Sequence, residues 1–289
     1  MKILALDIGG TGMQFRIFES NDINGASAVE SISTRDIHKD DLLKVIADLV
    51  NKHEPKILAV SSPGGIINKT YVSGISGVKG YGNFDFKEEL MPHIKNKELI
   101  ISLLNDANAA LLSEINESNK NLDIVLISIG TGIGGAIAFN GKIRPGNRGF
   151  TGEFGYQIVD EKEQVSAASS SRAIETKFKN LFNEAKTAKE IMDSYDTDER
   201  SKKIIDIIVH QNAINIFNIY YGLDIDLFIL SGGITNSKEF VKMINDEVEH
   251  LTKTRGAGNH IEIQVAKEKG SASLKGAMMQ GIIEAKKAN

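Results

Sequence analysis

The sequence predicts an α/β protein built from two related halves. Each half opens on the same pattern, in which an apolar β-type run, a glycine–threonine turn and a second β-type run follow one another. The first turn reads Gly9-Gly10-Thr11 and the second reads Gly130-Thr131-Gly132. Alternating apolar residues on both sides of each turn are typical of paired strands. Because helix and strand patterns then alternate in both halves, we interpret the chain as a structural duplication.

The first half is strand-rich at its start and then alternates helix and strand. Residues 1–30 alternate in polarity with a period of two, which predicts a β-meander. An amphipathic helix is expected over 40–52, with Asp40 as its N-cap. The other expected elements are a strand at 57–61, a glycine-punctuated loop or short hairpin at 71–83, a strand at 100–104 and a helix at 107–114.

The second half begins near Asn119 and repeats this order. Residues 172–222 are predicted to be helical, because their apolar residues trace one broad helix face. A later helix is expected to start at Asn236, where Glu239 completes a capping-box pattern. The expected strands lie at 124–129, 135–144, 226–230 and 261–266, and a last helix lies at 273–285.

Composition excludes several classes of function. The chain has 289 residues, a net charge of −4 and no cysteine. The charge gives no basic footprint for nucleic acid, and the missing cysteines exclude disulfides, thiolate metal sites and cysteine nucleophiles. No signal peptide and no apolar stretch of about 18 residues is present, so we expect no membrane partner and a cytoplasmic protein.

The glycine turns are candidate phosphate sites. Glycines let the backbone bend sharply and bring several N–H donors close to one ligand. Asp7 ends the strand before the first turn, where a carboxylate is suited to hold Mg²⁺ through water. Gly130, Gly132 and Gly135 also match a dinucleotide fingerprint, but a strand follows them where that motif requires a helix. Two tight hairpins without a ligand are the structural alternative.

Two further segments carry candidate chemistry. Asn105-Asp106 ends a buried strand, and Asp106 is either a cap of the next helix or a general base in phosphoryl transfer. A neighbouring carboxylate and carboxamide also suit the binding of vicinal sugar hydroxyls. Glu153 lies in a glycine-rich loop, for which a positional role is favoured over a solvated loop glutamate.

Six short segments, in order, resemble those of the ROK sugar kinases. They are Leu6–Thr11, Ser62–Gly65, Leu104–Ala110, Ile129–Gly135, Gly152–Gly155 and Leu230–Ile234. The resemblance covers nearly the whole chain and implies a duplicated ribonuclease-H-like, actin-like ATPase fold with a cleft between the halves. It further implies domains 1–117 and 118–272, with the last helix at 273–289 returning to the first, and a homodimer.

The resemblance also implies an ATP- and Mg²⁺-dependent sugar kinase that phosphorylates the 6-hydroxyl of a glucose-type ring. Asp106 matches the catalytic base, and Asp7 the magnesium-side carboxylate. The sugar-binding set is Gly65, Asn83, Asn105, Asp106, Glu153 and Tyr156. The nucleotide-binding set is Asp7, Gly9, Gly10, Thr11, Gly130, Thr131, Gly132, Gly232 and Gly233.

The departures from the family pattern bear on the substrate. Tyr156 stands where many relatives have a histidine that binds sugar and zinc, and their three zinc cysteines are missing, so we expect no zinc. The family's second sugar-binding glutamate is missing too, from the segment Gln164–Ser169. A tyrosine offers a flat ring with a hydroxyl, which favours a β-glucoside kinase. The alternatives are a glucokinase, a fructokinase, an N-acetylmannosamine kinase, or a non-catalytic sugar sensor or repressor.

Overall fold

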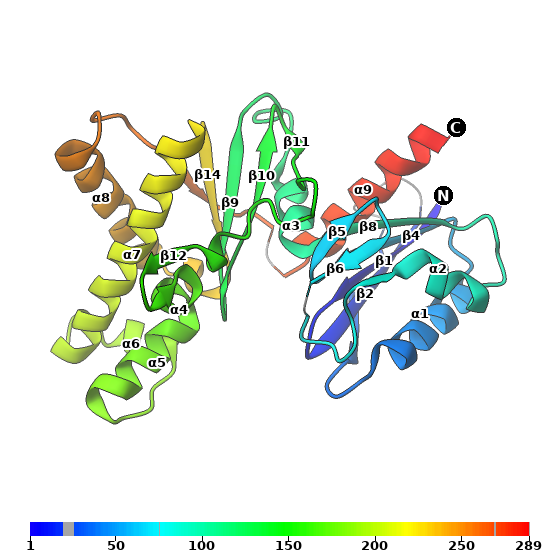
Figure 1. Ribbon diagram of the computed structural model, residues 1–289, viewed down its shortest axis with the longest axis horizontal. Coiled ribbons are helices and arrows are strands. Elements are labelled where there is room, and N and C mark those ends of the chain that lie inside the picture. Colours follow the sequence, from blue (N-terminus) through cyan, green and yellow to red (C-terminus); the bar gives the residue numbers. More distant parts are fainter. Residues whose placement is uncertain (20–25, 75, 269, 289) are drawn as a thin grey trace. The chain divides into compact units, whose positions relative to one another are not determined.

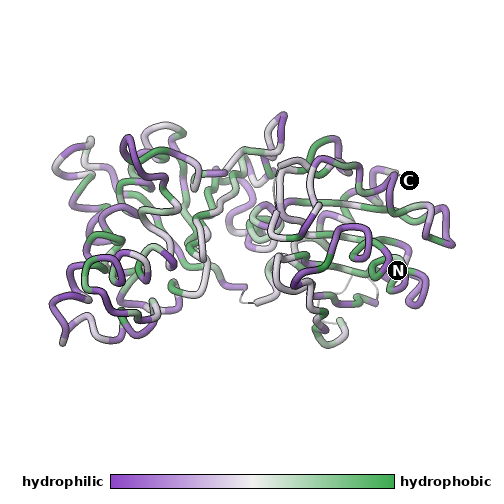
Figure 2. The backbone as a smooth tube through the Cα atoms, turned by 60° about the horizontal axis from the view of Figure 1, so that its bottom comes forward, coloured by the Kyte–Doolittle hydropathy of each residue, from purple (hydrophilic) through white to green (hydrophobic). Residues whose placement is uncertain are grey.

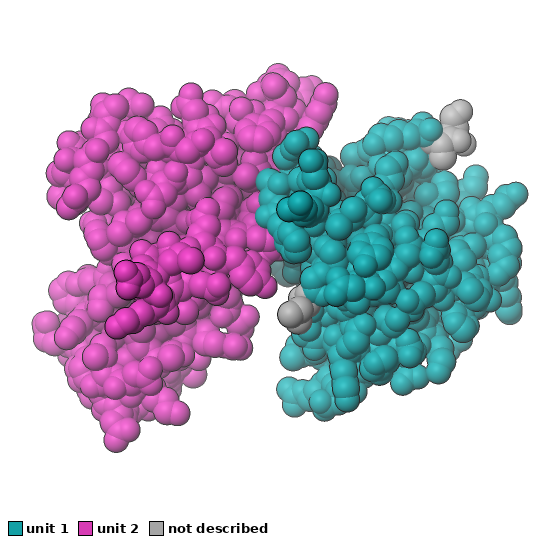
Figure 3. Space-filling model, viewed as in Figure 1, with its two compact units in different colours: residues 1–117, 143–151, 268–289 teal, residues 118–142, 152–267 magenta. Residues whose placement is uncertain are grey.

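The computed structural model describes residues 1–19, 26–74, 76–268 and 270–288. The chain forms two compact units (Figure 3). The first contains residues 1–117, 143–151 and 268–289, and the second contains 118–142 and 152–267. The division differs from the domain boundaries expected from the sequence in two places. The segment 143–151 packs with the first unit, and the chain returns to that unit at residue 268 rather than at about 273.

The first unit is built on a five-stranded sheet in the order β3-β2-β1-β4-β8 (Figure 1). β1, β2 and β3 are antiparallel neighbours, whereas β4 and β8 run parallel to β1. The strands are β1 (Lys2–Ile8), β2 (Gly12–Glu19), β3 (Glu30–Ser33), β4 (Ile57–Ser62) and β8 (Ile100–Asn105). The helices are α1 (Lys39–His53), α2 (Phe86–Leu90), α3 (Asp106–Glu114) and α9 (Ala272–Ala288).

Helices cover both faces of this sheet, and successive side chains of β1 pack alternately against the helices of one face and of the other. Leu4 and Leu6 belong to the cluster that contains the apolar face of α1, including Leu42. Ile3 and Ala5 belong instead to the cluster with α9, which includes Leu274. The period of two therefore places one set of side chains on each face, as expected for a strand covered by helices on both sides.

A small antiparallel sheet in the order β5-β6-β7 extends the first unit. Its strands are β5 (Gly65–Ile67), β6 (Tyr71–Ser73) and β7 (Phe84–Asp85), and the short helix η2 (Met91–His93) follows α2. The segment 71–83, expected to be a loop or short hairpin, begins with β6. This strand pairs with β5, which precedes the segment, and with β7, which follows it. The hairpin directly follows the loop at the end of β4.

The second unit repeats the strand order of the first, as β11-β10-β9-β14-β15 (Figure 1). Its strands are β9 (Ile124–Ile129), β10 (Ile133–Phe139), β11 (Lys142–Ile143), β14 (Leu227–Ser231) and β15 (Ile263–Val265), with a β12 (Ile158–Asp160) and β13 (Glu163–Gln164) pair beside them. Its helices are η3 (Phe154–Tyr156), α4 (Val165–Ser169), α5 (Ser171–Phe182), α6 (Ala188–Asp193), α7 (Glu199–Leu223), η4 (Gly233–Asn236) and α8 (Lys238–Arg255). The equal order of the two sheets confirms the duplication.

Hydrophobic segments run along the strands of both sheets (Figure 2). The core of the second unit joins β9 and β14 to the inner faces of α5, α7 and α8. Across the residues that the structure describes, no helix is both long and apolar enough to cross a membrane.

Two helix starts differ from the sequence-based expectation. The N-cap of α1 is His38 rather than Asp40, and the imidazole of His38 accepts from the Asp40 N–H. The His38 ring lies against Gly80, and His38 forms a β-bridge with Lys79, so a tertiary contact sets this helix start. The cap of α8 is Ser237 rather than Asn236.

Candidate active site

The first glycine turn is a tight hairpin between β1 and β2. The Gly9 N–H donates to the Gly12 carbonyl at 2.9 Å, and the Thr34 hydroxyl donates to the Gly9 carbonyl at 2.7 Å. A Cβ added to Gly10 would lie 3.0 Å from the Cα of Gly77. The chain's own packing therefore accounts for the missing side chain at Gly10. Thr11, at the tip, is exposed.

Asp7 lies near the end of β1, next to β4. Its Oδ1 accepts a hydrogen bond of 2.6 Å from the Ser61 hydroxyl. Burial raises the pKa of the Asp7 carboxyl, the bond from Ser61 opposes this shift, and the nearby charge of Asp106 raises the pKa further. The first unit therefore brings the carboxyl groups of Asp7 and Asp106 close together.

Asn105 and Asp106 have separate roles at the junction of β8 and α3. Asn105 is the N-cap of α3, and its Oδ1 accepts from the N–H groups of Ala107 and Asn108. Its amide also donates to the Gly64 carbonyl at 3.0 Å. Because Asn105 caps the helix, Asp106 is not needed for that purpose.

The Asp106 side chain is closely surrounded by protein atoms, although part of its surface stays open to solvent. Its Oδ1 accepts from the Ala107 N–H at 2.8 Å. Removal from bulk water raises the pKa of the Asp106 carboxyl, and the hydrogen bonds from the Ala107 backbone and the Asn105 side chain oppose that shift. Asp106 is thus an accessible carboxylate whose basicity is raised, which are the two properties that a general base needs.

The loop after β4 is held in place by contacts within the first unit. Gly64 has φ +86°, and a Cβ on it would lie 2.6 Å from the Ser73 carbonyl. A Cβ on Gly65 would lie 3.0 Å from the carbonyls of both Arg148 and Gly149. The segment 143–151 therefore lies directly against the predicted sugar loop.

Asn83 is close to the same loop. It adopts φ 57°, and its Oδ1 accepts from the Gly74 N–H at 3.3 Å. This bond orients the carboxamide with its oxygen turned to the protein. Asn83 is exposed, so its NH₂ group is accessible as a donor to a sugar hydroxyl.

The second glycine turn joins β9 to β10 in the second unit. The Gly130 N–H donates to the Gly132 carbonyl at 2.9 Å, and the Ser171 N–H donates to the Gly130 carbonyl at 2.9 Å. Thr131 is exposed at the tip. No neighbour lies closer than 4.0 Å to a Cβ built on Gly130, and its φ is outside the left-handed region. The protein fold itself therefore does not require glycine at this position.

Gly232 and Gly233 follow β14 and differ from each other. Gly232 has φ +103°, and a Cβ there would lie 2.2 Å from the Ile129 carbonyl, so the fold requires this glycine. Nothing lies within 4 Å of a Cβ on Gly233. The contact with Ile129 places Gly232 beside the residue that precedes the second turn.

Glu153 and Tyr156 lie in the second unit. Glu153 is half-buried, whereas 66% of the Tyr156 surface is exposed. Gly152 has φ +91°, and a Cβ on it would lie 2.5 Å from the Gly135 carbonyl. A Cβ on Gly155 would lie 2.1 Å from the Ile133 carbonyl. Both glycines flanking Glu153 are therefore needed to pack this loop against β10.

Sequence reasoning missed two regions next to these residues. One is the segment 143–151, which contacts Gly65 and carries Phe150, a 51% exposed ring beside Gly74. The other is the start of α5, where Arg172 and Thr131 line one cavity. The serine run before Arg172 was a helix-start signal that could have directed attention to α5.

The residues around Asp7 fit a magnesium ion. Mg²⁺ uses one or two carboxylates together with water and substrate phosphates, rather than a cage made only of protein groups. Asp7 offers a hard oxygen ligand, and a cation would favour its charged form against the burial and the Asp106 charge that raise its pKa. Outside residues 20–25, 75, 269 and 289, no group of three or more His, Cys, Asp or Glu side chains is arranged to hold a metal ion.

Comparison with known proteins identifies the class to which this fold and these residues belong. The model of the ROK family matches residues 3–280. An N-acetyl-D-glucosamine kinase of Histophilus somni (strain 129Pt) is 28% identical over 277 residues, which cover 86% of this chain and 89% of the relative. A β-glucoside kinase of Listeria monocytogenes serovar 1/2a is 28% identical over 301 residues, which cover 96% of each.

A solved structure shows the same relationship. A ROK family protein from Streptococcus pneumoniae TIGR4, in complex with sucrose, superposes with a TM-score of 0.87 at 26% identity and covers 99% of this chain and 100% of its own. The chain therefore belongs to the ROK family, with the ribonuclease-H-like, actin-like fold that the motifs implied. Its named relatives support a carbohydrate kinase.

Proposed function

We propose that this carbohydrate kinase transfers the γ-phosphate of ATP to the 6-hydroxyl of a glucose-type hexose or a β-glucoside. The observation that carries the proposal is the division of roles at the start of α3. Asn105 caps the helix, so the Asp106 carboxylate remains accessible and has a raised pKa.

In this proposal Asp106 accepts the proton of the attacking hydroxyl. The sugar oxygen then attacks the γ-phosphorus and the bond to ADP breaks, so the proton remains on the carboxylate until solvent removes it. Phosphoryl transfer depends mainly on positioning and charge stabilisation, so the carboxylate must be accurately placed. Asn105 helps to place it, because its bonds to Ala107 and Gly64 connect α3 to the sugar loop.

We assign the sugar to Gly65, Asn83, Asn105, Asp106, Glu153 and Tyr156, as the family resemblance implies. The accessible NH₂ group of Asn83 supports its role as a hydroxyl donor. The exposed ring of Tyr156 supports stacking on an apolar sugar face or on the group attached to the anomeric oxygen. The similarity to a β-glucoside kinase is consistent with such a substrate.

We assign the phosphates to the two glycine–threonine turns and the adenosine side to Gly232 and Gly233. The open space beside Gly130 and Gly233 supports this assignment, because glycine there leaves room for a ligand that a methyl group would exclude. Asp7 would hold Mg²⁺ through water, and the ion when bound would neutralise charge on the phosphates. We further expect far less than one zinc per chain in elemental analysis of untagged protein.

A coupled assay of ADP release tests the proposal directly. The panel contains glucose, fructose, N-acetylmannosamine, cellobiose and an aryl β-glucoside, with ATP hydrolysis in the absence of sugar as the baseline. We expect ADP release above baseline with glucose or a glucoside, and a 6-phosphate product by NMR. If calorimetry detects sugar binding while no sugar raises ADP release, the protein is a sensor and the kinase proposal is wrong.

A further inference from the structure

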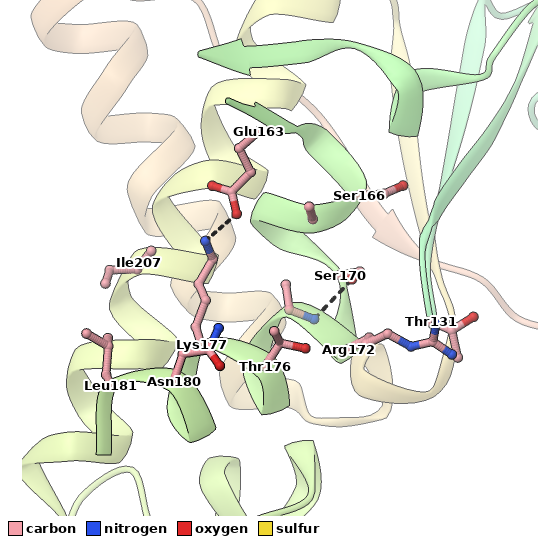
Figure 4. A pocket seen from close by; sticks show the side chains of 12 residues that line it. Thr131, Glu163, Ser166, Ser170, Arg172, Thr176, Lys177, Asn180, Leu181 and Ile207 are labelled. Atoms are coloured by element: carbon pink, nitrogen blue, oxygen red, sulfur yellow. Dashed lines mark hydrogen bonds and ion pairs between the residues drawn. The ribbon is translucent and has the colours of Figure 1, made fainter. Parts of the chain in front are cut away.

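A cavity of about 530 Å³ lies within the second unit, beside the second glycine turn (Figure 4). Its walls come from the turn, from β13, from α4 and from one face of α5, with Ile207 contributed by α7. Thr131 belongs to this lining, and so do Arg172 and Lys177 of α5. The cavity therefore begins at a residue that the proposed function assigns to phosphate.

The backbone of α5 is fixed against the turn. The Ser171 N–H donates to the Gly130 carbonyl at 2.9 Å, and Ser170 caps the helix by accepting from the Ala173 N–H. Arg172 therefore lies between Ser171 and Ala173, whose backbone N–H groups are both held by these hydrogen bonds. Figure 4 shows its side chain extending from α5 toward the end of the cavity where Thr131 lies. Its position beside the turn is thus set by the fold.

The guanidinium of Arg172 carries a charge that the described part of the second unit does not balance. Arg172 has no ion pair or hydrogen-bonded side chain among those residues, whereas Arg200 pairs with Asp198 and Glu184 at 2.8 Å. The carboxylate in the cavity wall, Glu163, is already matched by Lys177 at 2.6 Å. The end of the cavity near Thr131 is therefore positive and suited to an anion.

We propose that Arg172 binds the phosphate chain of the nucleotide that the second turn holds. This inference rests on the proposed function, to which it adds a residue outside the glycine motifs. A guanidinium can donate two parallel hydrogen bonds to phosphate oxygens, and it remains charged at every pH at which the enzyme works. Gly130 belongs to the same turn as Thr131, and the open space at Gly130 leaves room for the same phosphates.

Calorimetric titration of the full chain with ATP, ADP and adenosine tests the proposal. The variants are Arg172→Ala, Arg172→Lys and the matched control Lys179→Ala. Lys179 is an exposed cation on the same helix that does not line the cavity. We expect Arg172→Ala to raise the Kd for ATP and ADP by roughly 10- to 100-fold, the usual range for hydrogen bonds to charged groups, and to leave adenosine binding within a few fold. Arg172→Lys should recover part of the loss, and Lys179→Ala should match wild type.

Inorganic tripolyphosphate gives a second readout without a nucleoside. It should compete with ATP on the wild-type protein and lose most of this competition on Arg172→Ala. An equal loss for adenosine and ATP would mean that Arg172 only shapes the cavity, which overturns the proposal. Sugar phosphorylation by wild type with an unchanged ATP Kd in Arg172→Ala overturns this inference and leaves the proposed function intact. If ATP binding depends on Arg172 but no sugar is phosphorylated, this inference stands and the proposed function is wrong.

Discussion

The two glycine turns occupy the same place in two sheets of equal strand order, yet their surroundings differ. In the first unit, the missing side chain of Gly10 is accounted for by the backbone of Gly77, which passes in direct contact. In the second unit, no atom of the described residues lies closer than 4.0 Å to a Cβ built on Gly130. The close backbone of Gly77 thus accounts for glycine at position 10, whereas the described residues leave open space at position 130.

The strand ends beside the turns differ in the same way. Asp7 of β1 pairs with Ser61 of β4, and the matching position of β9, Ser128, pairs with Ser231 of β14. One sheet thus carries a carboxylate where its counterpart carries a hydroxyl. Under the proposed function, the carboxylates of proton transfer and magnesium binding both belong to the first unit, whereas the corresponding strand ends of the second unit carry hydroxyls.

The largest expected effect concerns Asp106. Asp106→Asn keeps the shape and the acceptor for the Ala107 N–H but removes the charge and the basicity. General-base catalysis is typically worth about 10² to 10⁴-fold, so kcat for sugar phosphorylation should fall by about 10³-fold or more. Nucleotide binding, measured by calorimetry, should be retained.

Ser128→Ala is a control in the second unit. Ser128 occupies the position that corresponds to Asp7 but carries no charge. We expect its kcat to stay within a few fold of wild type. Activity of Asp106→Asn within tenfold of wild type would reject the catalytic role of Asp106, and with it the division of labour between the units.

A pair of alanine substitutions tests the two turns against each other. Gly10→Ala forces a methyl group against the Gly77 backbone, which cannot rotate away, so the free energy of unfolding should fall by about 1–3 kcal/mol. Gly130→Ala meets no neighbour and should unfold at the urea concentration of wild type or slightly above it. Its Kd for ATP should rise roughly tenfold, or about 1.4 kcal/mol, because the methyl group occupies the space left for phosphate.

Urea unfolding and calorimetry on both variants separate these effects. Equal losses of stability would show that the open space at Gly130 has no special meaning. An unchanged ATP affinity in Gly130→Ala would assign the second turn to structure alone.

The hydroxyl of Thr131 should contribute less than the glycines. Thr131→Val removes one donor at the exposed tip of the turn, so the ATP Kd should rise by a few fold to about tenfold, the usual range for one hydrogen bond. Sugar affinity should change less, and Thr131→Ser should restore nucleotide binding. Calorimetry with both ligands is the measurement, and a larger change in sugar than in ATP affinity would contradict the assignment.

The two hairpins at the glycine turns were predictable from the sequence, because both of the signals that a hairpin needs are local. A two-residue alternation and a glycine turn lie within one short stretch, and the strand pairs that flank Gly9–Thr11 and Gly130–Gly132 formed as predicted. The packing of 143–151 with the first unit had no local signal. It depends on the contact of Gly149 with Gly65, which are far apart in the chain.

The positions of the site residues were predictable where these residues belong to sequence motifs. They were not predictable where tertiary contacts between distant residues determine them. Motifs placed Asp106 at a strand end, but only the structure shows that Asn105 is the cap. Arg172 belongs to no motif, and its interest comes from a cavity and from the absence of a counter-charge among the described residues. Helix starts such as that at His38 shifted for the same reason, because the contact with Gly80 outweighs the local capping preference.

The smallest expected effect is in the pH dependence of stability, and it has opposite signs in the two units. Burial raises the pKa of Asp106, so its contribution to stability is present below the ordinary aspartate pKa of about 3.9 and is lost as the pH rises through the raised value. The hydrogen bond from Arg200 lowers the pKa of Asp198, so its contribution is present above about 3.9 and is lost as the pH falls through the lowered value.

Asparagine substitutions at these two positions should therefore move the Tm in opposite directions. At pH 7, Asp106→Asn removes a charge that the fold disfavours and should raise the Tm. Asp198→Asn keeps the cap of α7 but loses the charge that Arg200 favours, so it should lower the Tm. The Asp106→Asn difference should shrink as the pH falls through the raised pKa of Asp106 and be absent below about 3.9. The Asp198→Asn difference should start to shrink only below about 3.9, as the pH falls toward the lowered pKa of Asp198. Thermal melts between pH 3 and 8 measure this. A lower Tm for Asp106→Asn at pH 7 would show that Asp106 stabilises the first unit, as Asp198 does the second, and is not held there at a cost to folding.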